Sequence, residues 1–211
     1  MIFCIVEVFN RTPIDARIGS ERIWYACYGS NLSRWRLMCY LEGTSPTEGG
    51  NPHEGAKESS PPRRSLLAKT GHRVYFAGSK SRWGEGGFGF ITREPAGADC
   101  YLVLWDLSRE QFEDVFMMEA GVAVGSVDVP LEEIWDKGEA VVIPGNAYGT
   151  GVCLGVYDSM PVCTFTCESD REDVNPPSAL YAKVIADGLV DHGVDREEAE
   201  NYVKRLAHFR S

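Results

Sequence analysis

Short runs of apolar and aromatic residues, separated by turn residues, predict several short strands along this chain. Residues 22–28, Arg-Ile-Trp-Tyr-Ala-Cys-Tyr, are rich in aromatic and apolar side chains and are followed by Gly29. A short apolar run that stops at a turn residue is typical of a buried strand. The same criteria predict further strands at residues 73–77, 88–92, 100–107, 122–129, 139–143 and 162–167.

Helical spacing of apolar residues predicts four helices. The first spans residues 32–41 with Asn31 as its N-cap, and the second spans residues 108–118. Ser108 and Gln111 form a capping-box pattern at the start of the second helix. The third helix follows Pro176-Pro177-Ser178 and ends near residue 192, and the fourth begins after Asp195. The residues expected to form the buried stripe of the third helix are Leu180, Val184 and Leu189.

The order of these elements indicates an α+β fold in a single domain. Many short strands with helices placed late and irregularly favour a mixed β-barrel with flanking helices, and a regular β-α-β alternation is missing. A length of 211 residues suits one domain. We assign residues 1–21 to an N-terminal extension or leading strand and residues 22–211 to the domain.

One segment interrupts the domain. From residue 43 to about 62–65 the composition changes to Gly, Pro, Ser, Glu and Lys, with Thr-Glu-Gly-Gly-Asn-Pro-His-Glu-Gly at its centre. Such a composition offers little apolar area to offset the entropy of ordering. We therefore expect a mobile surface insertion at about 43–65, long enough to act as a lid.

Charge and cysteine usage narrow the class of partner. A net charge of −10 argues against a nucleic-acid or anionic-membrane surface. The seven cysteines contain no C-x-x-C pair, which favours free thiols in a reducing, cytoplasmic compartment. Cys163 and Cys167 lie close together in sequence, but no histidine stands at zinc spacing from them, so we expect no metal site. No apolar run reaches the length of a membrane span, and we expect no signal peptide.

Two places in the sequence are candidates for chemistry. At Tyr28-Gly29-Ser30-Asn31-Leu32, a glycine turn followed by a helix N-terminus could present free amides to a carboxylate or an oxyanion. Taken alone, the turn is better explained as an ordinary strand–helix junction. Glu119 lies in the apolar stretch Phe-Met-Met-Glu-Ala-Gly-Val, where burial would raise its pKa and suit it to acid–base work. Taken alone, it is better explained as a helix-end glutamate that points to water.

The order of the motifs resembles the γ-glutamylcyclotransferase family over roughly residues 22 to 206. Tyr-Ala-Cys-Tyr-Gly-Ser-Asn-Leu at 25–32 is similar to the signature strand and loop of that family. Glu119 is similar to its catalytic glutamate, although Ala120 here separates the glutamate from the glycine that follows. The remaining motifs that match in order are Gly86-Gly87-Phe88, Leu104-Trp105, the helix at 108–118 and Pro176-Pro177-Ser178-Ala179-Leu180-Tyr181.

The resemblance implies an enzyme that needs no cofactor and cleaves a small γ-glutamyl substrate to 5-oxoproline and a free amine. It implies Glu119 as general acid–base and the substrate α-amine as nucleophile. The residues that it implies for substrate binding are Tyr25, Ala26, Cys27, Tyr28, Gly29, Ser30, Asn31 and Tyr181. Two alternatives stay open: a non-catalytic binding module with the same fold, and a cyclotransferase for a specialised biosynthetic intermediate, such as a γ-glutamyl group on an acyl carrier.

Overall fold

A single mixed sheet organises the computed structural model, which describes residues 6–8, 21–44 and 52–207. Its seven strands lie in the order β1-β3-β6-β2-β9-β8-β7. The β1–β3 and β2–β9 pairs are parallel and the other pairs are antiparallel. The strands are β1 Val6–Val8, β2 Arg22–Cys27, β3 Ser65–Ala77, β6 Phe88–Ser108, β7 Glu139–Val141, β8 Thr150–Tyr157 and β9 Met160–Thr166. A separate hairpin is formed by β4 Lys80–Ser81 and β5 Gly84–Glu85.

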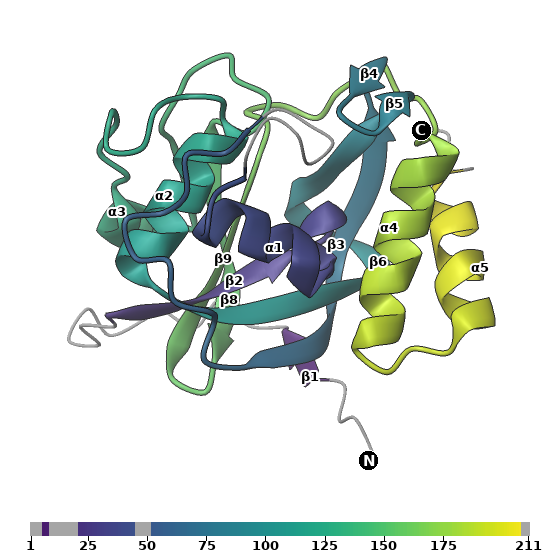
Figure 1. Ribbon diagram of the computed structural model, residues 1–211, viewed down its shortest axis with the longest axis horizontal. Helices are drawn as coiled ribbons and strands as arrows, with labels where there is room; N and C mark the ends of the chain where they lie inside the picture. The colour runs from purple at the N-terminus through teal and green to yellow at the C-terminus, as the bar shows by residue number, and fades with distance from the viewer. Residues whose placement is uncertain (1–5, 9–20, 45–51, 208–211) are drawn as a thin grey trace.

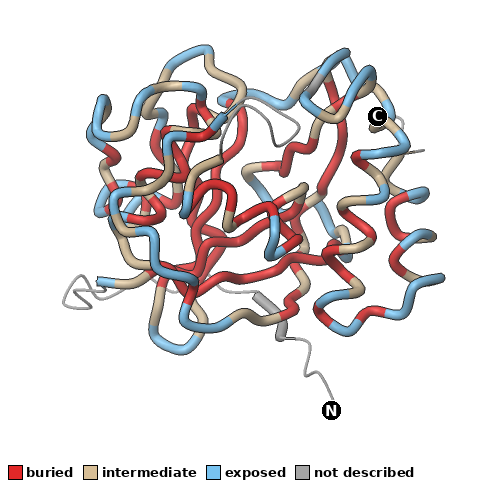
Figure 2. The backbone as a smooth tube through the Cα atoms, viewed as in Figure 1, coloured by how far each residue is buried: buried red, intermediate tan, exposed pale blue. Residues whose placement is uncertain are grey.

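The central strand β2 is buried along almost its whole length because β6 and β9 flank it. Trp24 in β2 and Trp105 in β6 are among the largest fully buried side chains. Figure 2 shows the buried positions gathered along the central strands and the exposed positions on the outer loops and helix faces. The edge strand β1 also approaches β8, so the sheet curls on itself. The predicted fold class, a single α+β domain with a mixed β-barrel and flanking helices, is confirmed.

Five α-helices flank the sheet in the described part of the chain. They are α1 Arg34–Leu41, α2 Arg109–Glu119, α3 Leu131–Lys137, α4 Ala179–Asp191 and α5 Arg196–Ala207. Helices α4 and α5 pack against each other on one side of the molecule, while α2 and α3 lie on the opposite side (Figure 1). The predicted capping box of Ser108 and Gln111 is present, and Asp195 accepts hydrogen bonds from the amides of Glu197 and Glu198.

Several predicted elements differ in the structure. The predicted strands at 88–92 and 100–107 are two parts of the long strand β6, and residues 122–129 form turns instead of a strand. Helix α3 and strand β8 were missed. Asn31 does not cap a helix: it lies in the short 3₁₀ helix Ser30–Leu32, and Ser33 is the N-cap residue of α1.

The described part of the predicted insertion packs on the helices. The amide of Ala56 donates to backbone carbonyls of α1, and the amide of Lys57 donates to the Asp114 carboxylate at 2.8 Å. Gln111 donates to the carbonyl of Glu58 at 3.1 Å. Residues 45–51 lie outside the described residues, and the mobility of the insertion stays a prediction. Within the described ranges, no helix is both long and apolar enough to cross a membrane.

Candidate functional site

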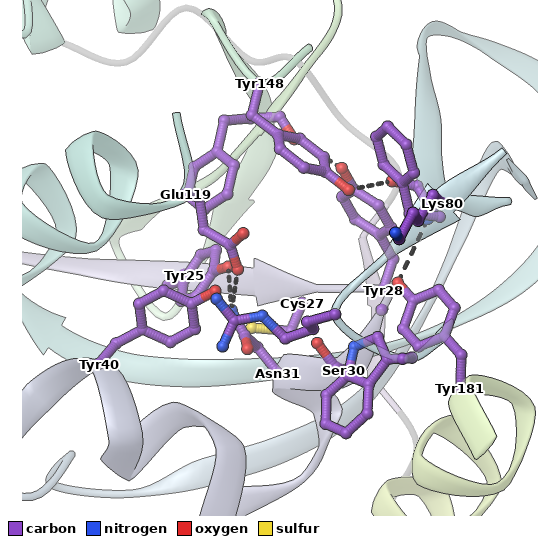
Figure 3. Close-up of a pocket in the computed structure, with 16 residues that line it drawn as sticks. Tyr25, Cys27, Tyr28, Ser30, Asn31, Tyr40, Lys80, Glu119, Tyr148 and Tyr181 are labelled. Carbon is purple, nitrogen blue, oxygen red and sulfur yellow. Dashed lines mark hydrogen bonds between the residues drawn. The ribbon is translucent and has the colours of Figure 1, made fainter. Parts of the chain in front are cut away.

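A pocket of about 650 Å³ opens between the sheet, the 3₁₀ helix Ser30–Leu32, the ends of α1 and α2 and the start of α4 (Figure 3). Its volume falls in the range that small-molecule sites usually have. Half of the residues that line it are aromatic, and two are glycines. The residues that line it are Tyr25, Cys27, Tyr28, Gly29, Ser30, Asn31, Tyr40, Lys80, Arg82, Trp83, Phe88, Gly89, Glu119, Tyr148, Phe165 and Tyr181.

The pocket floor comes from alternate residues of β2. Tyr25 and Cys27 point into the pocket, and Tyr28 joins them just after the strand ends. Ala26 does not line the pocket, although we expected it to bind substrate. Side chains of a strand alternate between its two faces, so Ala26 is directed into the core on the other side, where it is fully buried.

Gly29 is required by the close approach of Tyr181. A Cβ atom at position 29 would lie 2.7 Å from the Tyr181 hydroxyl oxygen, and one at Gly89 would lie 3.1 Å from it. Two glycines on different elements therefore make room for one hydroxyl. The same absence of side chains leaves the backbone of the turn open to the pocket.

Tyr181 reaches this position from the first turn of α4. Its hydroxyl oxygen accepts a hydrogen bond from the Gly89 amide at 3.2 Å, and its ring stacks on Trp83 with centroids 6.1 Å apart. Burial raises the pKa of Tyr181, while the amides of Gly89 and Ser30 act in the opposite direction. The hydroxyl is protonated at neutral pH, and because its oxygen accepts from backbone, its own proton is available to a ligand.

Asn31 connects the glycine turn to Glu119. Its side-chain amide donates to Glu119 Oε1 at 2.8 Å and to the Tyr25 hydroxyl at 3.1 Å. Its backbone carbonyl accepts from Trp105 Nε1 at 2.8 Å, which fixes the turn against β6. The side chain is only 4% exposed, so it is held in this orientation by its surroundings. Its role here replaces the predicted helix cap.

Glu119 is the last residue of α2, and its partly buried carboxylate faces Asn31, Tyr25 and Tyr40 (Figure 3). Helix α2 continues to Glu119 itself, Ala120 keeps a helical conformation, and Gly121 then turns with φ +72°. The extra residue Ala120 therefore leaves the carboxylate inside the pocket. Burial raises the pKa of Tyr40, and the negative charge of Glu119 raises it further.

About half of the residues that line the pocket were not predicted from the sequence. Tyr148 donates to the Gly89 carbonyl at 2.8 Å, and burial raises its pKa, as it does for Tyr28 and Tyr25. No local pattern around Tyr148 distinguishes it from a core aromatic residue. The other lining residues that were missed are Tyr40, Lys80, Arg82, Trp83, Phe88, Gly89 and Phe165.

The site chemistry is that of carboxylate, amide and phenol groups. In the part of the chain that the structure describes, no group of three His, Cys, Asp or Glu side chains is arranged to hold a metal ion. The described cysteines, Cys27 of the pocket among them, are free thiols. Burial raises the pKa of Cys27, so its thiol is protonated and a weak nucleophile at neutral pH.

The architecture of this chain is similar to that of solved structures. A structure described as a gamma-glutamyl cyclotransferase superposes with a TM-score of 0.50 and 18% sequence identity, over 86% of each chain. The chain has the γ-glutamyl cyclotransferase-like fold. An uncharacterized protein from Homo sapiens (TM-score 0.49, 17% identity, 87% of each chain) is also similar. So is YkqA from Bacillus subtilis (TM-score 0.48, 14% identity), over 92% of this chain and 57% of that one.

Comparison by sequence finds a relative whose name differs from those of the similar structures. No protein-family model matches the chain. "Histone deacetylase 5" of Arabidopsis thaliana is 32% identical over 212 aligned residues, which cover 92% of this chain and 32% of the plant protein. The chain thus spans about a third of the length of this relative.

Proposed function

We propose that the chain is a γ-glutamyl cyclotransferase-type enzyme that releases 5-oxoproline from a small γ-glutamyl amide. The observation that supports this most is the hydrogen bond of 2.8 Å between Asn31 and Glu119. It joins an acid–base group to an open glycine turn in one pocket, although the two are 88 residues apart in sequence. Both the turn and the carboxylate are needed for ring closure.

The reaction needs no protein nucleophile because the substrate carries one. Its α-amine attacks its own γ-carbonyl carbon, a new C–N bond closes the five-membered ring, and the original γ-amide C–N bond breaks. Such an intramolecular attack gains up to ~7–11 kcal/mol from proximity when the geometry is favourable. An α-amino group has a pKa of about 8, so at neutral pH it must first lose a proton. Glu119 would take this proton and return one to the leaving amine.

The glycine turn and Tyr181 would stabilise negative charge on the substrate. Gly29, Ser30, Asn31 and Tyr181 all line the pocket, and backbone amides of the turn together with the Tyr181 hydroxyl would be the donors. Preorganised donors of this kind suit the substrate α-carboxylate or the oxyanion that develops on the attacked carbonyl. Asn31 would orient the Glu119 carboxylate, and Tyr25 would orient Asn31.

The plant relative contains the matched region as one part of a longer protein. That protein is about three times as long as this chain, and the matched region is only 32% of it. We therefore do not carry deacetylase activity over to this chain. We propose instead that the matched region of that protein forms a separate pocket of the kind described above.

Glu119→Gln tests the proposal because it keeps the size of the side chain but cannot accept the proton. We expect 5-oxoproline formation from γ-glutamyl dipeptides to fall about 10²- to 10⁴-fold at saturating substrate, the usual effect of losing a general base. Binding, measured by calorimetry, should change little. Glu110→Gln, an exposed carboxylate on the same helix, is the matched control and should leave the rate unchanged. Equal rates in wild type and Glu119→Gln would remove Glu119 from this role. Binding without turnover in the wild type would favour the non-catalytic module.

A further inference from the structure

The loop of residues 143–149, between β7 and β8, is closed by its own backbone. The amide of Ile143 donates to the Gly149 carbonyl at 3.0 Å, and the amide of Asn146 donates to the Ile143 carbonyl at 3.2 Å. A Cβ atom at position 149 would collide with the Ile143 carbonyl, so only glycine lets the loop close this tightly. The loop is therefore a preorganised support for the side chains that it carries.

Asn146 uses both ends of its side-chain amide. Its Oδ1 accepts from the amide of Tyr148 at 2.9 Å, which forms an Asx turn within the loop. Its Nδ2 donates to the Ala120 carbonyl at 2.8 Å, at the end of α2 and 26 residues away in sequence. Asn146 itself is not one of the residues that line the pocket.

The end of α2 explains why the Ala120 carbonyl takes a donor from outside the helix. The two amides that follow Ala120 donate to the carbonyls of Met118 and Met117 at 3.2 and 3.0 Å, which is a Schellman pattern. This pattern does not reach the Ala120 carbonyl, and the last turn of α2 contains no basic side chain. The last carbonyls of a helix need partners from elsewhere. Asn146 supplies one of them.

The Ala120 carbonyl is one residue away from Glu119, so a donor that fixes it also fixes the backbone that carries the carboxylate. Inside the pocket, that carboxylate accepts from Asn31 at 2.8 Å. A misplacement of about 1 Å can lower the rate of an enzyme about 10²-fold. Glu119 is thus held by Asn31 from within the pocket and by Asn146 from outside it.

The other hydrogen bond of Asn146 leads to a different part of the pocket wall. Tyr148, whose amide it accepts, lines the pocket, and the Tyr148 hydroxyl donates to the Gly89 carbonyl at 2.8 Å. The amide of Gly89 donates in turn to the Tyr181 hydroxyl oxygen at 3.2 Å. Figure 3 shows Glu119, Tyr148 and Tyr181 around the same cavity. One side chain outside the pocket therefore connects two parts of its wall.

We propose that Asn146 is a positioning residue for the proposed reaction and that it fixes the Glu119 carboxylate through the Ala120 carbonyl. This inference rests on the proposed cyclotransfer, in which Glu119 is the acid–base group. It adds a residue that touches neither the substrate nor the reacting atoms.

Asn146→Asp separates the positioning of Glu119 from the structure of the loop. Aspartate forms Asx turns as asparagine does, so the Tyr148 amide keeps its acceptor, but a carboxylate has no N–H for the Ala120 carbonyl. With γ-glutamyl-alanine, Asn146→Asp and Asn146→Ala should both lower the kcat of the folded enzyme about 10- to 100-fold. KM should change less than about twofold, because the glycine turn is fixed separately by the bond from Trp105 Nε1 to the Asn31 carbonyl.

Gln111→Ala is the matched control because it removes hydrogen bonds at the other end of the same helix. Gln111 Nε2 donates to the carbonyls of Glu58 and Ser60 at 3.1 and 2.7 Å. We expect Gln111→Ala to be less stable in urea but to keep the wild-type kcat in its folded fraction. A similar fall of kcat in this variant overturns the inference, because any loosening of α2 would then have the same effect.

The remaining outcomes are equally decisive. An unchanged kcat in Asn146→Asp would limit the residue to the turn of the loop. A loss in Asn146→Asp alone, with Asn146→Ala unchanged, would assign the effect to the added charge. A rise in KM in place of a fall in kcat would assign Asn146 to substrate binding through Tyr148. Each of these results overturns the inference and leaves the cyclotransferase intact.

Crystal structures of the wild type, Asn146→Asp and Gln111→Ala without substrate give a readout that does not depend on turnover. The distance between Asn31 Nδ2 and Glu119 Oε1 should exceed the hydrogen-bond limit of about 3.5 Å in Asn146→Asp only. If the wild type releases no 5-oxoproline, the proposed reaction fails, and this distance still decides whether Asn146 holds Glu119. A hydrogen bond retained in Asn146→Asp contradicts the inference.

Discussion

Two buried tyrosines, Tyr181 and Tyr202, use their hydroxyl oxygens in the same way. The Tyr181 oxygen accepts from the Gly89 amide at 3.2 Å, and the Tyr202 oxygen accepts from the Tyr101 amide at 3.0 Å. Tyr181 lines the pocket and Tyr202 does not. Comparing the two residues therefore separates the contribution of a buried hydroxyl to stability from its contribution to activity.

Tyr181→Phe and Tyr202→Phe should cost similar stability but differ in activity. Each variant leaves one buried amide without an acceptor, which costs about 1–3 kcal/mol in the free energy of unfolding. Only Tyr181→Phe also removes a donor from the pocket, and we expect its kcat to fall about 10²- to 10³-fold, as for the loss of an oxyanion donor. Urea denaturation and 5-oxoproline assays on both variants check this. A comparable loss of kcat in Tyr202→Phe would show that the effect reflects stability alone.

The contact between Gly29 and Tyr181 predicts a coupled pair of substitutions. Gly29→Ala places a Cβ atom 2.7 Å from the Tyr181 oxygen but 3.8 Å from the ring carbon behind it. We expect Gly29→Ala to cost about 1–3 kcal/mol through overpacking, and a large part of this to be regained when Tyr181→Phe removes the oxygen. A double-mutant cycle in urea measures the coupling. Gly71→Ala, where the nearest atom would lie at 3.9 Å, should be additive with Tyr181→Phe.

At the scale of elements, His53 joins three segments that are separate in sequence. It belongs to the insertion, its ring lies 4.1 Å from that of Tyr40 in α1, and it accepts from Arg82 in the β4–β5 hairpin. The insertion is thus tied to the hairpin at the mouth of the pocket through one neutral imidazole. Burial lowers the pKa of His53, and Arg36 and Arg82, which both donate to it, lower it further. A proton on His53 would place three cations together, so the folded protein resists protonation there.

This resistance predicts a loss of stability in mild acid. The pKa of His53 is about 3 in the folded protein, and a histidine in the unfolded chain titrates near 6.5. Above pH ~6.5 neither state binds the proton, whereas below it only the unfolded state does, so stability falls as the pH drops from about 6.5 towards 3. The contribution lost between pH ~7.5 and ~5.5 is about 1.4 kcal/mol. His53→Gln keeps an acceptor for the arginines but not the titration.

Urea denaturation of wild type and His53→Gln at the two pH values measures the effect. We expect the wild type to lose about 1.4 kcal/mol more than the variant over this interval. If both proteins lose the same free energy of unfolding, another group is responsible for the acid sensitivity. The comparison at the higher pH reports separately on the packing of the ring against Tyr40.

The elements that the sequence predicted well are those with a strong local signal. The capping box at Ser108 and the buried run of β2 depend on neighbouring residues alone, and both are present. The predicted buried stripe of α4 was correct at Leu189, which is fully buried, but displaced by one residue elsewhere. Leu180 is 54% exposed, whereas Tyr181 and Ile185 are buried. The apolar character of this helix continues around it, so spacing did not fix which side faces the sheet.

In the candidate site too, the residues with a recognisable sequence motif were predicted and the others were missed. The turn at Gly29 and the carboxylate of Glu119 could be found from the order of motifs, and the structure brings them into one pocket. Arg36, whose guanidinium lies over the ring of the pocket residue Trp83, was missed because a charged residue on a helix is usually exposed, while its apolar neighbour Trp35 proves to be 59% exposed. Which of the two is buried depends on His53 and Trp83, which are distant in sequence and adjacent only after folding.

At the scale of the whole molecule, the pocket belongs to no single part of the fold. Its wall takes residues from β2, from the end of α2, from the hairpin and from the start of α4, and most of these elements pack on the same sheet. None of these elements can separate from the sheet without opening the pocket. Structure and site should therefore be lost together when the protein unfolds.

Leu102→Ala tests this cooperativity. Leu102 is fully buried in β6, outside the pocket lining, and its truncation should cost about 2–5 kcal/mol through lost burial and the cavity left behind. Since β6 pairs with both β2 and β3, we expect one transition in urea, with the same lowered midpoint by far-UV circular dichroism, tryptophan fluorescence and ligand binding. The folded fraction should keep the wild-type kcat because the site residues are untouched. If ligand binding is lost at a lower urea concentration than circular dichroism, the pocket opens before the sheet, and the single cooperative unit would have to be divided.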